Sequence, residues 1–338
     1  DYPGGANRDD CRDDGDPLTF CFDQDLEIFA NWFLYFRSRD YVTKGALGIV
    51  LSQIQDIRIC YETISATTSE YVADMNDLYS EGEKRELLDN IYSVDSFGGT
   101  PLRQALGRAG QILGCRTGSD CPALPEPERQ CQQNFALLFS DGYWNGGTGV
   151  SINADEDGPG PFDGGRYADT VSQTLADVAM YYYENDLFPA TDDGVPVGIR
   201  DINGAPVGTF DGVDAMHQHM KTYTIAFGAQ GTLSPMIAQN HPVGSAFAWT
   251  DPFAGNLEKI DDMIHAAVNG RGTYLSAGNP QELQSAFEAA FLEFTQAASS
   301  ASAAAFNSTS LRDGTLLYRS FYDLRNRTGE LTATSVSS

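Results

Sequence analysis

The stretch Asn134 to Asn145 reads NFALLFSDGYWN, and it decides the fold class. Its unbroken apolar run, residues 135–139, is typical of a strand that is buried on both faces in a parallel sheet. Ser140, Asp141 and Gly142 end this run abruptly, so an acid stands at the carboxyl end of the predicted strand. Ligands of open α/β sheets bind at this edge. The stretch therefore predicts an α/β protein with Asp141 at its binding edge.

A glycine turn followed by a helix lies upstream of this strand. Residues 97–102 read FGGTPL, and the amphipathic run LRQALGRAGQIL begins at Leu102. Because proline is favoured at the first helical position, we expect a helix that starts at Pro101 with Thr100 as its N-cap. Thr100 would then lie near the sheet edge that carries Asp141.

Together, GGTPL and the apolar strand ending in SDG resemble the second and third motifs of the von Willebrand factor type A domain. The resemblance implies that Thr100 and Asp141 help to hold a divalent cation at a metal-ion-dependent adhesion site, which accepts an acidic group from a partner. Oxygen ligands suit a hard cation, so Mg²⁺ is the expected ion, with Ca²⁺ or Mn²⁺ as alternatives. In the other interpretation, Thr100 is only a helix cap and Asp141 only a turn residue.

The first motif of that family, Asp-x-Ser-x-Ser at the end of the first strand, is not found in this sequence. A buried strand is also missing ahead of the first long helix, which is expected to begin near Asp25. We therefore expect the central strand to lie upstream of Asp1 or to come from another chain, and the metal site to be incomplete in these residues.

Composition limits the classes of partner. The chain has 338 residues, 41% of them hydrophobic, and can bury one large core or two modest ones. Its net charge of −26 makes nucleic acids and anionic membrane surfaces poor partners. No apolar segment is long enough to span a bilayer. Since a signal peptide and an initiator Met are both lacking, we expect a processed or truncated form of a longer, exported protein.

The six cysteines indicate disulfides. None of their spacings is that of a zinc ribbon, and three of them flank a Pro-rich loop that a crosslink would stabilise. Disulfides imply an oxidising compartment. We expect Cys11 to pair with Cys21, and Cys131 to pair with either Cys115 or Cys121.

Helix and strand patterns alternate up to about residue 297. This alternation predicts a doubly wound, Rossmann-like α/β domain over residues 23–297, behind an irregular acidic lead-in at residues 1–22. The expected helices are 25–55, 102–113, 169–186, 261–268 and 280–296, and the expected further strands are 57–64 and 220–228. Two long insertions rich in Gly, Asp and Pro are expected at residues 146–169 and 189–214.

The last residues, 298–338, are expected to belong to a different unit. A Ser/Ala-rich joint leads to two strand-like segments, GTLLYRSFYD at 314–323 and GELTATSV at 329–336. Two strands cannot form an independent core, so we expect them to pack on the preceding domain or to begin a β-rich one.

A second candidate site lies in the first insertion. Asn153, Asp155 and Asp157 alternate like the opening of an EF-hand calcium loop. Gly164 stands where the twelfth position requires an acid, so a standard loop is excluded. A non-standard calcium site and a solvated acidic loop remain as alternatives.

Catalytic motifs are lacking. The sequence has no G-x-S-x-G elbow, no phosphate-binding G-x-x-x-x-G-K and no H-E-x-x-H, and no histidine is placed by a motif to activate Ser140. We therefore expect a protein that is not an enzyme.

Several longer segments extend the resemblance over most of the chain: ANWFLYFRSRDYVTKGAL, FGGTPLRQALGRAG, CQQNFALLFSDGYWN, TLADVAMYYYENDL, HQHMKTYTIAFG and FNSTSLRDGTLLYRSFYDLRNRTGEL. In this order they resemble the PilY family of type IV pilus tip-associated adhesins and biogenesis factors. The resemblance implies a von Willebrand factor A-like domain followed by a β-propeller, with residues 298–338 at their junction.

It also implies an extracellular location at the pilus tip or outer cell surface, and a function in pilus assembly and adhesion. The implied partners are minor pilins and a host or surface receptor. The alternative is a metal-independent scaffold that binds minor pilins.

Overall fold

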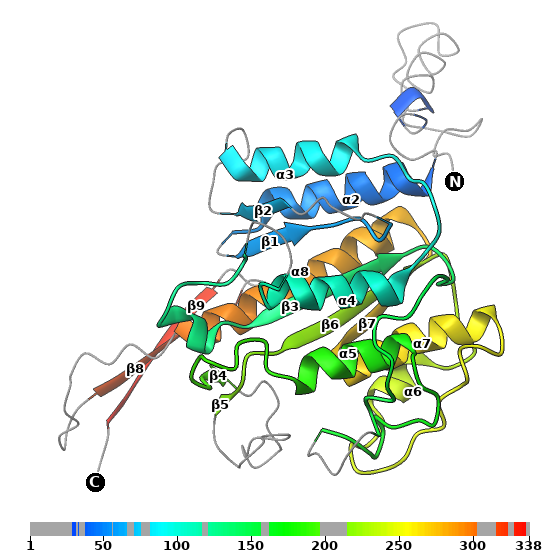
Figure 1. Ribbon diagram of the computed structural model, residues 1–338. Coiled ribbons are helices and arrows are strands. Elements are labelled where there is room, and N and C mark those ends of the chain that lie inside the picture. The colour runs from blue at the N-terminus through cyan, green and yellow to red at the C-terminus, as the bar shows by residue number, and fades with distance from the viewer. Residues whose placement is uncertain are drawn as a thin grey trace, which may run out of the picture.

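The computed structural model describes residues 29–31, 33, 38–55, 57–65, 71–75, 82–116, 121–156, 162–196, 215–302, 316–323 and 328–335. Its centre is a three-stranded parallel sheet with the order β3-β6-β7 (Figure 1). The strands are β3 (Asn134–Ser140), β6 (Met220–Phe227) and β7 (Arg271–Ala277). Within the described residues, β3 pairs along one edge only, with β6.

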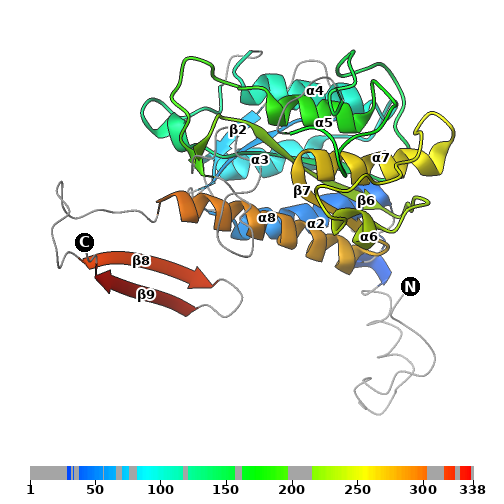
Figure 2. The ribbon, with the colours of Figure 1, turned by 90° about the horizontal axis from the view of Figure 1, so that it is seen from below.

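Helices pack on both sides of this sheet (Figures 1 and 2). One hydrophobic cluster joins β6 to the helices α2 (Arg39–Gln53), α3 (Gly82–Ser93) and α8 (Pro280–Ser302). A second cluster joins β3 and β6 to α4 (Leu102–Leu113), α5 (Leu175–Glu184), α6 (Pro235–Gln239) and α7 (Asn256–Asn269). The predicted α/β class with a parallel sheet is thus confirmed.

The apolar run of β3 lies between these clusters, as predicted for a strand buried on both faces. Ala136 and Leu138 are buried in the cluster that contains α4 and α5. On the opposite side, the ring of Phe135 stacks on Phe294 of α8, with ring centroids 4.7 Å apart. Side chains on both faces therefore hold the strand that ends at Asp141.

Among the described residues, α8 is the longest helix, with 23 residues, and its apolar positions lie in the cluster with α2, α3 and β6, as the sequence predicts. No helix within the described ranges is both long and apolar enough to cross a membrane.

Three antiparallel pairs complete the described structure: β1 (Arg58–Tyr61) with β2 (Tyr71–Asp74), β4 (Val195–Pro196) with β5 (Ala215–Met216), and β8 (Leu316–Asp323) with β9 (Thr328–Ser335). The two strand-like segments predicted near the end of the chain are thus β8 and β9, which form one hairpin (Figure 2).

The single helix predicted over residues 25–55 is wrong. Ser38 has an extended backbone, with φ −132° and ψ 154°, and a new helix, α2, begins after it. The Ser38 hydroxyl accepts a hydrogen bond from the backbone N–H of Tyr41 at 3.3 Å. Serine at this position satisfies an amide of the first turn, which favours a helix start over helix continuation.

The predicted pairing of Cys131 is also wrong. Cys115 and Cys121 form a disulfide with each other, with Cα atoms 5.0 Å apart. Cys131 is an exposed thiol at the end of the 3₁₀ helix η1 (Glu128–Cys131), where it donates to the Glu128 carbonyl. Cys115 and Cys121 are six residues apart in the sequence, closer than either is to Cys131. The predicted partners Cys11 and Cys21 lie outside the described residues.

Removing this disulfide is expected to lower the free energy of unfolding by about 2 kcal/mol, since the closed loop is short. Urea unfolding of a Cys115→Ala, Cys121→Ala variant measures this loss. Cys131→Ala is the matched control and should change stability by less than about 0.5 kcal/mol. Equal losses in the two variants would contradict the assigned pairing.

Candidate functional site

The two loops identified in the sequence lie side by side at the carboxyl end of β3. The backbone N–H of Asn145 donates to the Thr100 carbonyl at 2.8 Å. In return, the backbone N–H of Thr100 donates to Asn145 Oδ1 at 3.1 Å. A Cβ on Gly99 would lie 2.6 Å from that same Oδ1, so only glycine permits this approach. The GGTPL loop and the loop after SDG are therefore one structural unit.

A third segment supports the GGTPL loop. The Ser65 hydroxyl lies within hydrogen-bond distance of the carbonyls of Phe97, at 3.3 Å, and Gly99, at 3.1 Å. Gly98, between them, has φ +88°, a left-handed conformation that glycine adopts without strain. The loop conformation thus depends on both glycines of the motif.

Thr100 does not cap α4 as predicted. The N-cap is Pro101, with φ −81° and ψ 60°, and no side chain forms a capping hydrogen bond there. Instead, the backbone N–H of Leu102 donates to the Thr100 carbonyl at 2.9 Å. Because the proline backbone is not helical, the helix starts one residue later than predicted, at Leu102.

Asp141 is exposed at the end of β3, and its partner is an arginine from the start of α2. Arg39 Nη1 lies 3.3 Å from Asp141 Oδ2 and donates to the Asp141 carbonyl oxygen at 3.1 Å. The side chains are 57% and 52% exposed, so this pair contributes only about 0–1 kcal/mol. Sequence reasoning missed Arg39, which lies far from Asp141 along the chain.

These residues fit a weakly held hard cation. The Asp141 carboxylate and the Thr100 hydroxyl offer oxygen atoms of the kind that hard cations bind, and Mg²⁺ binds proteins through one or two carboxylates while keeping several waters. Arg39 is a competitor, since its guanidinium already neutralises the carboxylate that a cation would bind. No hydrogen bond between the side chains of Thr100 and Asp141 is present within the described contacts.

Two residues of the possible calcium loop, Asn153 and Asp155, lie in the described part of the chain. The Asp155 side chain is fully buried and is turned away from solvent, toward Asp169 and Asn269. Asn153 donates through Nδ2 to the Asp169 carbonyl at 3.1 Å. Asp157 lies outside the described residues. Asp155 is therefore not part of a solvated acidic loop.

Comparison with known proteins finds three curated relatives, all named type IV pilus biogenesis factor PilY1 and all from Pseudomonas aeruginosa. The protein of strain PAK is 28% identical over 77% of this chain, and that of strain UCBPP-PA14 is 26% identical over 85%. The resemblance to the PilY family is confirmed.

The chain spans about a quarter of the length of these PilY1 relatives. No protein-family model matches the chain. No solved structure matches it either.

Proposed function

We propose that this chain is part of a type IV pilus biogenesis factor that acts at the pilus tip or the outer cell surface, in pilus assembly and in adhesion. The similarity to PilY1 supports the association with the pilus. The observation that carries the adhesion part is the pairing of the Thr100 loop with the loop that follows the exposed Asp141. The absence of a catalytic motif fits a binding protein.

In this proposal Asp141 and Thr100 hold Mg²⁺, with Asp141 acting through a bound water. When bound, the cation would supply an open coordination position for a carboxylate of a minor pilin or of a host or surface receptor. Ser140 and Gly142 shape the turn, since the Gly142 N–H donates to Ser140 Oγ at 3.2 Å. Gly99 permits the close contact with Asn145.

The second candidate function is a metal-independent scaffold that binds minor pilins. The Arg39–Asp141 ion pair favours it, because this pair satisfies the exposed carboxylate without a cation. The two candidates differ in the role of Asp141. In the first, Asp141 binds a cation; in the second, it forms an ion pair with Arg39 of α2.

Titration of Mg²⁺, Mn²⁺ and Ca²⁺ into metal-stripped protein tests the first candidate. Asp141→Ala is expected to abolish cation binding at this edge. Arg39→Ala is expected to tighten it about threefold, because the competing guanidinium is lost. Asp89→Ala is the matched control: Asp89 is also exposed and paired with an arginine, Arg85, but lies on α3. Binding that Asp141→Ala leaves unchanged would contradict this metal site.

Binding to purified minor pilins, measured with and without EDTA, then separates the two candidates. Loss of pilin binding both in EDTA and in Asp141→Ala supports the metal-dependent site. Binding that survives both treatments supports the scaffold. A chain that binds no pilin under either condition would contradict both.

A further inference from the structure

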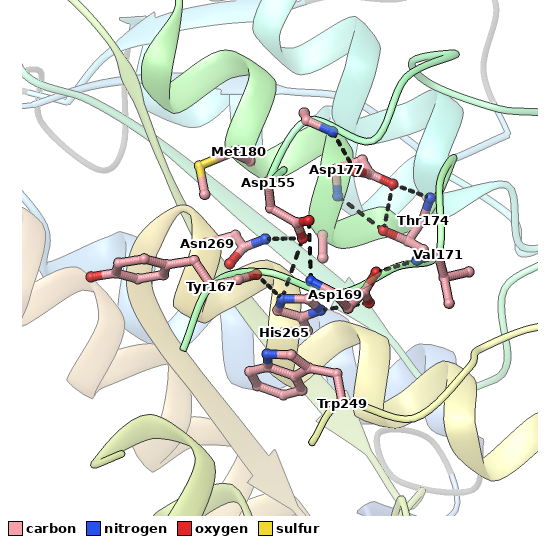
Figure 3. A network of polar contacts seen from close by, with 12 residues as sticks. Asp155, Tyr167, Asp169, Val171, Thr174, Asp177, Met180, Trp249, His265 and Asn269 are labelled. Atoms are coloured by element: carbon pink, nitrogen blue, oxygen red, sulfur yellow. Dashed lines mark hydrogen bonds and ion pairs between the residues drawn. The ribbon is translucent and has the colours of Figure 1, made fainter. Parts of the chain in front are cut away.

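A second cluster of ligand-type side chains lies away from the sheet edge, inside the protein. Asp155, Asp169 and His265 each offer one ligand atom, and these three atoms lie within 4.8 Å of one another (Figure 3). Asp155 and Asp169 come from the loop between β3 and α5, and His265 comes from α7. Segments about 100 residues apart therefore bring an imidazole and two carboxylates together.

Both ring nitrogens of His265 face oxygen atoms. Nδ1 lies 3.4 Å from Asp169 Oδ2. Nε2 lies 3.5 Å from Asp155 Oδ2 and 2.6 Å from the Tyr167 carbonyl oxygen. Without a metal, the imidazole must carry a proton on each nitrogen to satisfy these acceptors, because a neutral ring donates from one nitrogen only. The proton on Nε2 occupies the position that a cation would take.

Burial of this cluster makes charge balance important. The side chains of Asp155 and His265 are 0% and 3% exposed, and that of Asp169 is 9% exposed. Two carboxylates and one imidazolium leave a net charge of −1 in the interior, which is costly. A divalent cation in place of the Nε2 proton makes the same set neutral.

A buried amide next to the cluster points independently to a ligand. Asn269 is fully buried and its Oδ1 has no hydrogen-bond partner, while its Nδ2 donates to Asp155 Oδ2 at 3.0 Å. A buried acceptor without a donor costs about 1–3 kcal/mol. A half turn of the amide would put Oδ1 in the place of Nδ2, facing Asp155 Oδ2. Two oxygens facing each other are favourable only with a cation between them.

The surroundings close the cluster off from solvent. The Trp249 indole stacks on the His265 ring, with centroids 3.9 Å apart and the planes 11° from parallel. Trp249 is itself held by a hydrogen bond from Nε1 to the Arg166 carbonyl at 2.8 Å. Figure 3 shows Trp249 next to His265, and their stacking fixes the plane of the imidazole ring. A cation bound here would be shielded from bulk solvent by the surrounding side chains.

We propose that Asp155, Asp169 and His265 form a buried site for a divalent transition-metal cation, with Zn²⁺ as the preferred ion. Nε2 of His265, Asp155 Oδ2 and the Tyr167 carbonyl are the ligands, and Asp169 accepts from Nδ1 and orients the ring. Zn²⁺ binds such nitrogen and oxygen atoms at about 2.0–2.2 Å. Ligands in a tetrahedron are then about 3.4 Å apart. The 3.5 Å between Nε2 and Asp155 Oδ2 is close to this spacing. The Tyr167 carbonyl oxygen, 2.6 Å from Nε2, would have to move outward by about 0.8 Å to admit the ion.

An imidazole ligand favours Zn²⁺ over Ca²⁺, Mg²⁺ and Mn²⁺, which prefer oxygen ligands. This site is therefore distinct in chemistry and place from the one proposed at Asp141. Bound metal would join the long loop before α5 to α7.

Zn²⁺ binding to the metal-stripped chain tests this proposal. The Cys131→Ser background is used, so that the exposed thiol does not bind the metal. We expect one Zn²⁺ per chain after desalting, and affinities at least 100-fold lower in His265→Gln and in Asp155→Asn. Asp169→Asn, which affects only the orientation of the ring, is expected to weaken binding about 10- to 100-fold. His241→Gln and Asp89→Asn are the matched controls and should bind as the parent does.

Because buried variants can fail to fold, a second measurement uses the unsubstituted site. Co²⁺ bound to the Cys131→Ser chain is expected to give visible d–d absorption without a thiolate charge-transfer band, and Zn²⁺ is expected to displace it. Absence of stoichiometric Zn²⁺ in the folded parent, a thiolate band, or binding that persists in both His265→Gln and Asp155→Asn would each overturn the proposal.

Discussion

Asp262→Ala is expected to lower the free energy of unfolding by about 4 kcal/mol at pH 5, because three buried donors lose their acceptor. The Asp262 carboxylate accepts from Trp144 Nε1 at 2.9 Å and from the backbone N–H groups of Leu175 and Ala176 at 2.9 and 3.1 Å. Those two amides open α5, where no helical partner exists for them. The substitution thus removes both the acceptor for the first amides of α5 and the hydrogen-bond partner of Trp144.

Denaturant unfolding of the variant, beside Asp89→Ala, measures this effect. The Asp89 side chain is 65% exposed, so its removal should change stability by less than about 0.5 kcal/mol. Asp262→Asn keeps one acceptor oxygen, so its loss of unfolding free energy should lie between those of Asp262→Ala and Asp89→Ala. A loss below about 1 kcal/mol for Asp262→Ala would show that water replaces the carboxylate at α5.

The Asp262 effect is expected to depend on pH. Burial raises the pKa of Asp262 from 3.8 to about 6, against hydrogen bonds that lower it. The folded protein therefore binds a proton more readily than the unfolded chain. The resulting stability is fully present below pH 3.8 and is lost as the pH rises through about 6. The stability difference between the parent and Asp262→Ala should thus be larger at pH 4 than at pH 7.

Gly110→Ala is expected to destabilise the protein by about 2 kcal/mol, although alanine favours helices. A Cβ on Gly110 of α4 would lie 2.3 Å from the ring of Tyr182 on α5. The ring is buried and cannot move aside without displacing its neighbours. The close contact of α4 and α5 depends on this glycine.

Gly45→Ala provides the matched comparison within a helix. A Cβ at Gly45 of α2 meets no atom within 4 Å, so alanine should stabilise the protein by about 0.5–1 kcal/mol through helix propensity alone. In a Tyr182→Leu background, the cost of Gly110→Ala should shrink, since the ring is gone. Equal effects of the two glycine substitutions in thermal unfolding would contradict the contact.

Much of the fold follows from local patterns in the sequence. The run at residues 135–139 predicts a strand with two buried faces, and the periodicity of α8 predicts which side of that helix packs. β7 was not predicted because its sequence, RGTYLSA, contains a glycine and no continuous apolar run. Its side chains are partly exposed at the sheet edge, so packing with β6 determines it more than its composition does.

The sites were less predictable because they depend on contacts between distant segments. The GGTPL and SDG motifs predicted that Thr100 and Asp141 lie near the same edge of the sheet. Nothing in the sequence marked Arg39 as the partner of Asp141. His265 offered a weak signal, as a histidine among apolar residues of α7, but its partners Asp155 and Asp169 became evident only once the chain was folded.

The single pairing of β3 has a consequence for local motion. Within the described residues, one edge of this strand forms a ladder with β6, and the other edge forms none. In a parallel strand, alternate amides point to opposite edges, so only part of the β3 backbone is held by strand pairing. Side-chain packing against α8 and α4 holds the rest. Local opening that separates β3 from β6 would displace Asp141, which directly follows β3. The position of the carboxylate therefore depends on the stability of the hydrogen bonds between β3 and β6.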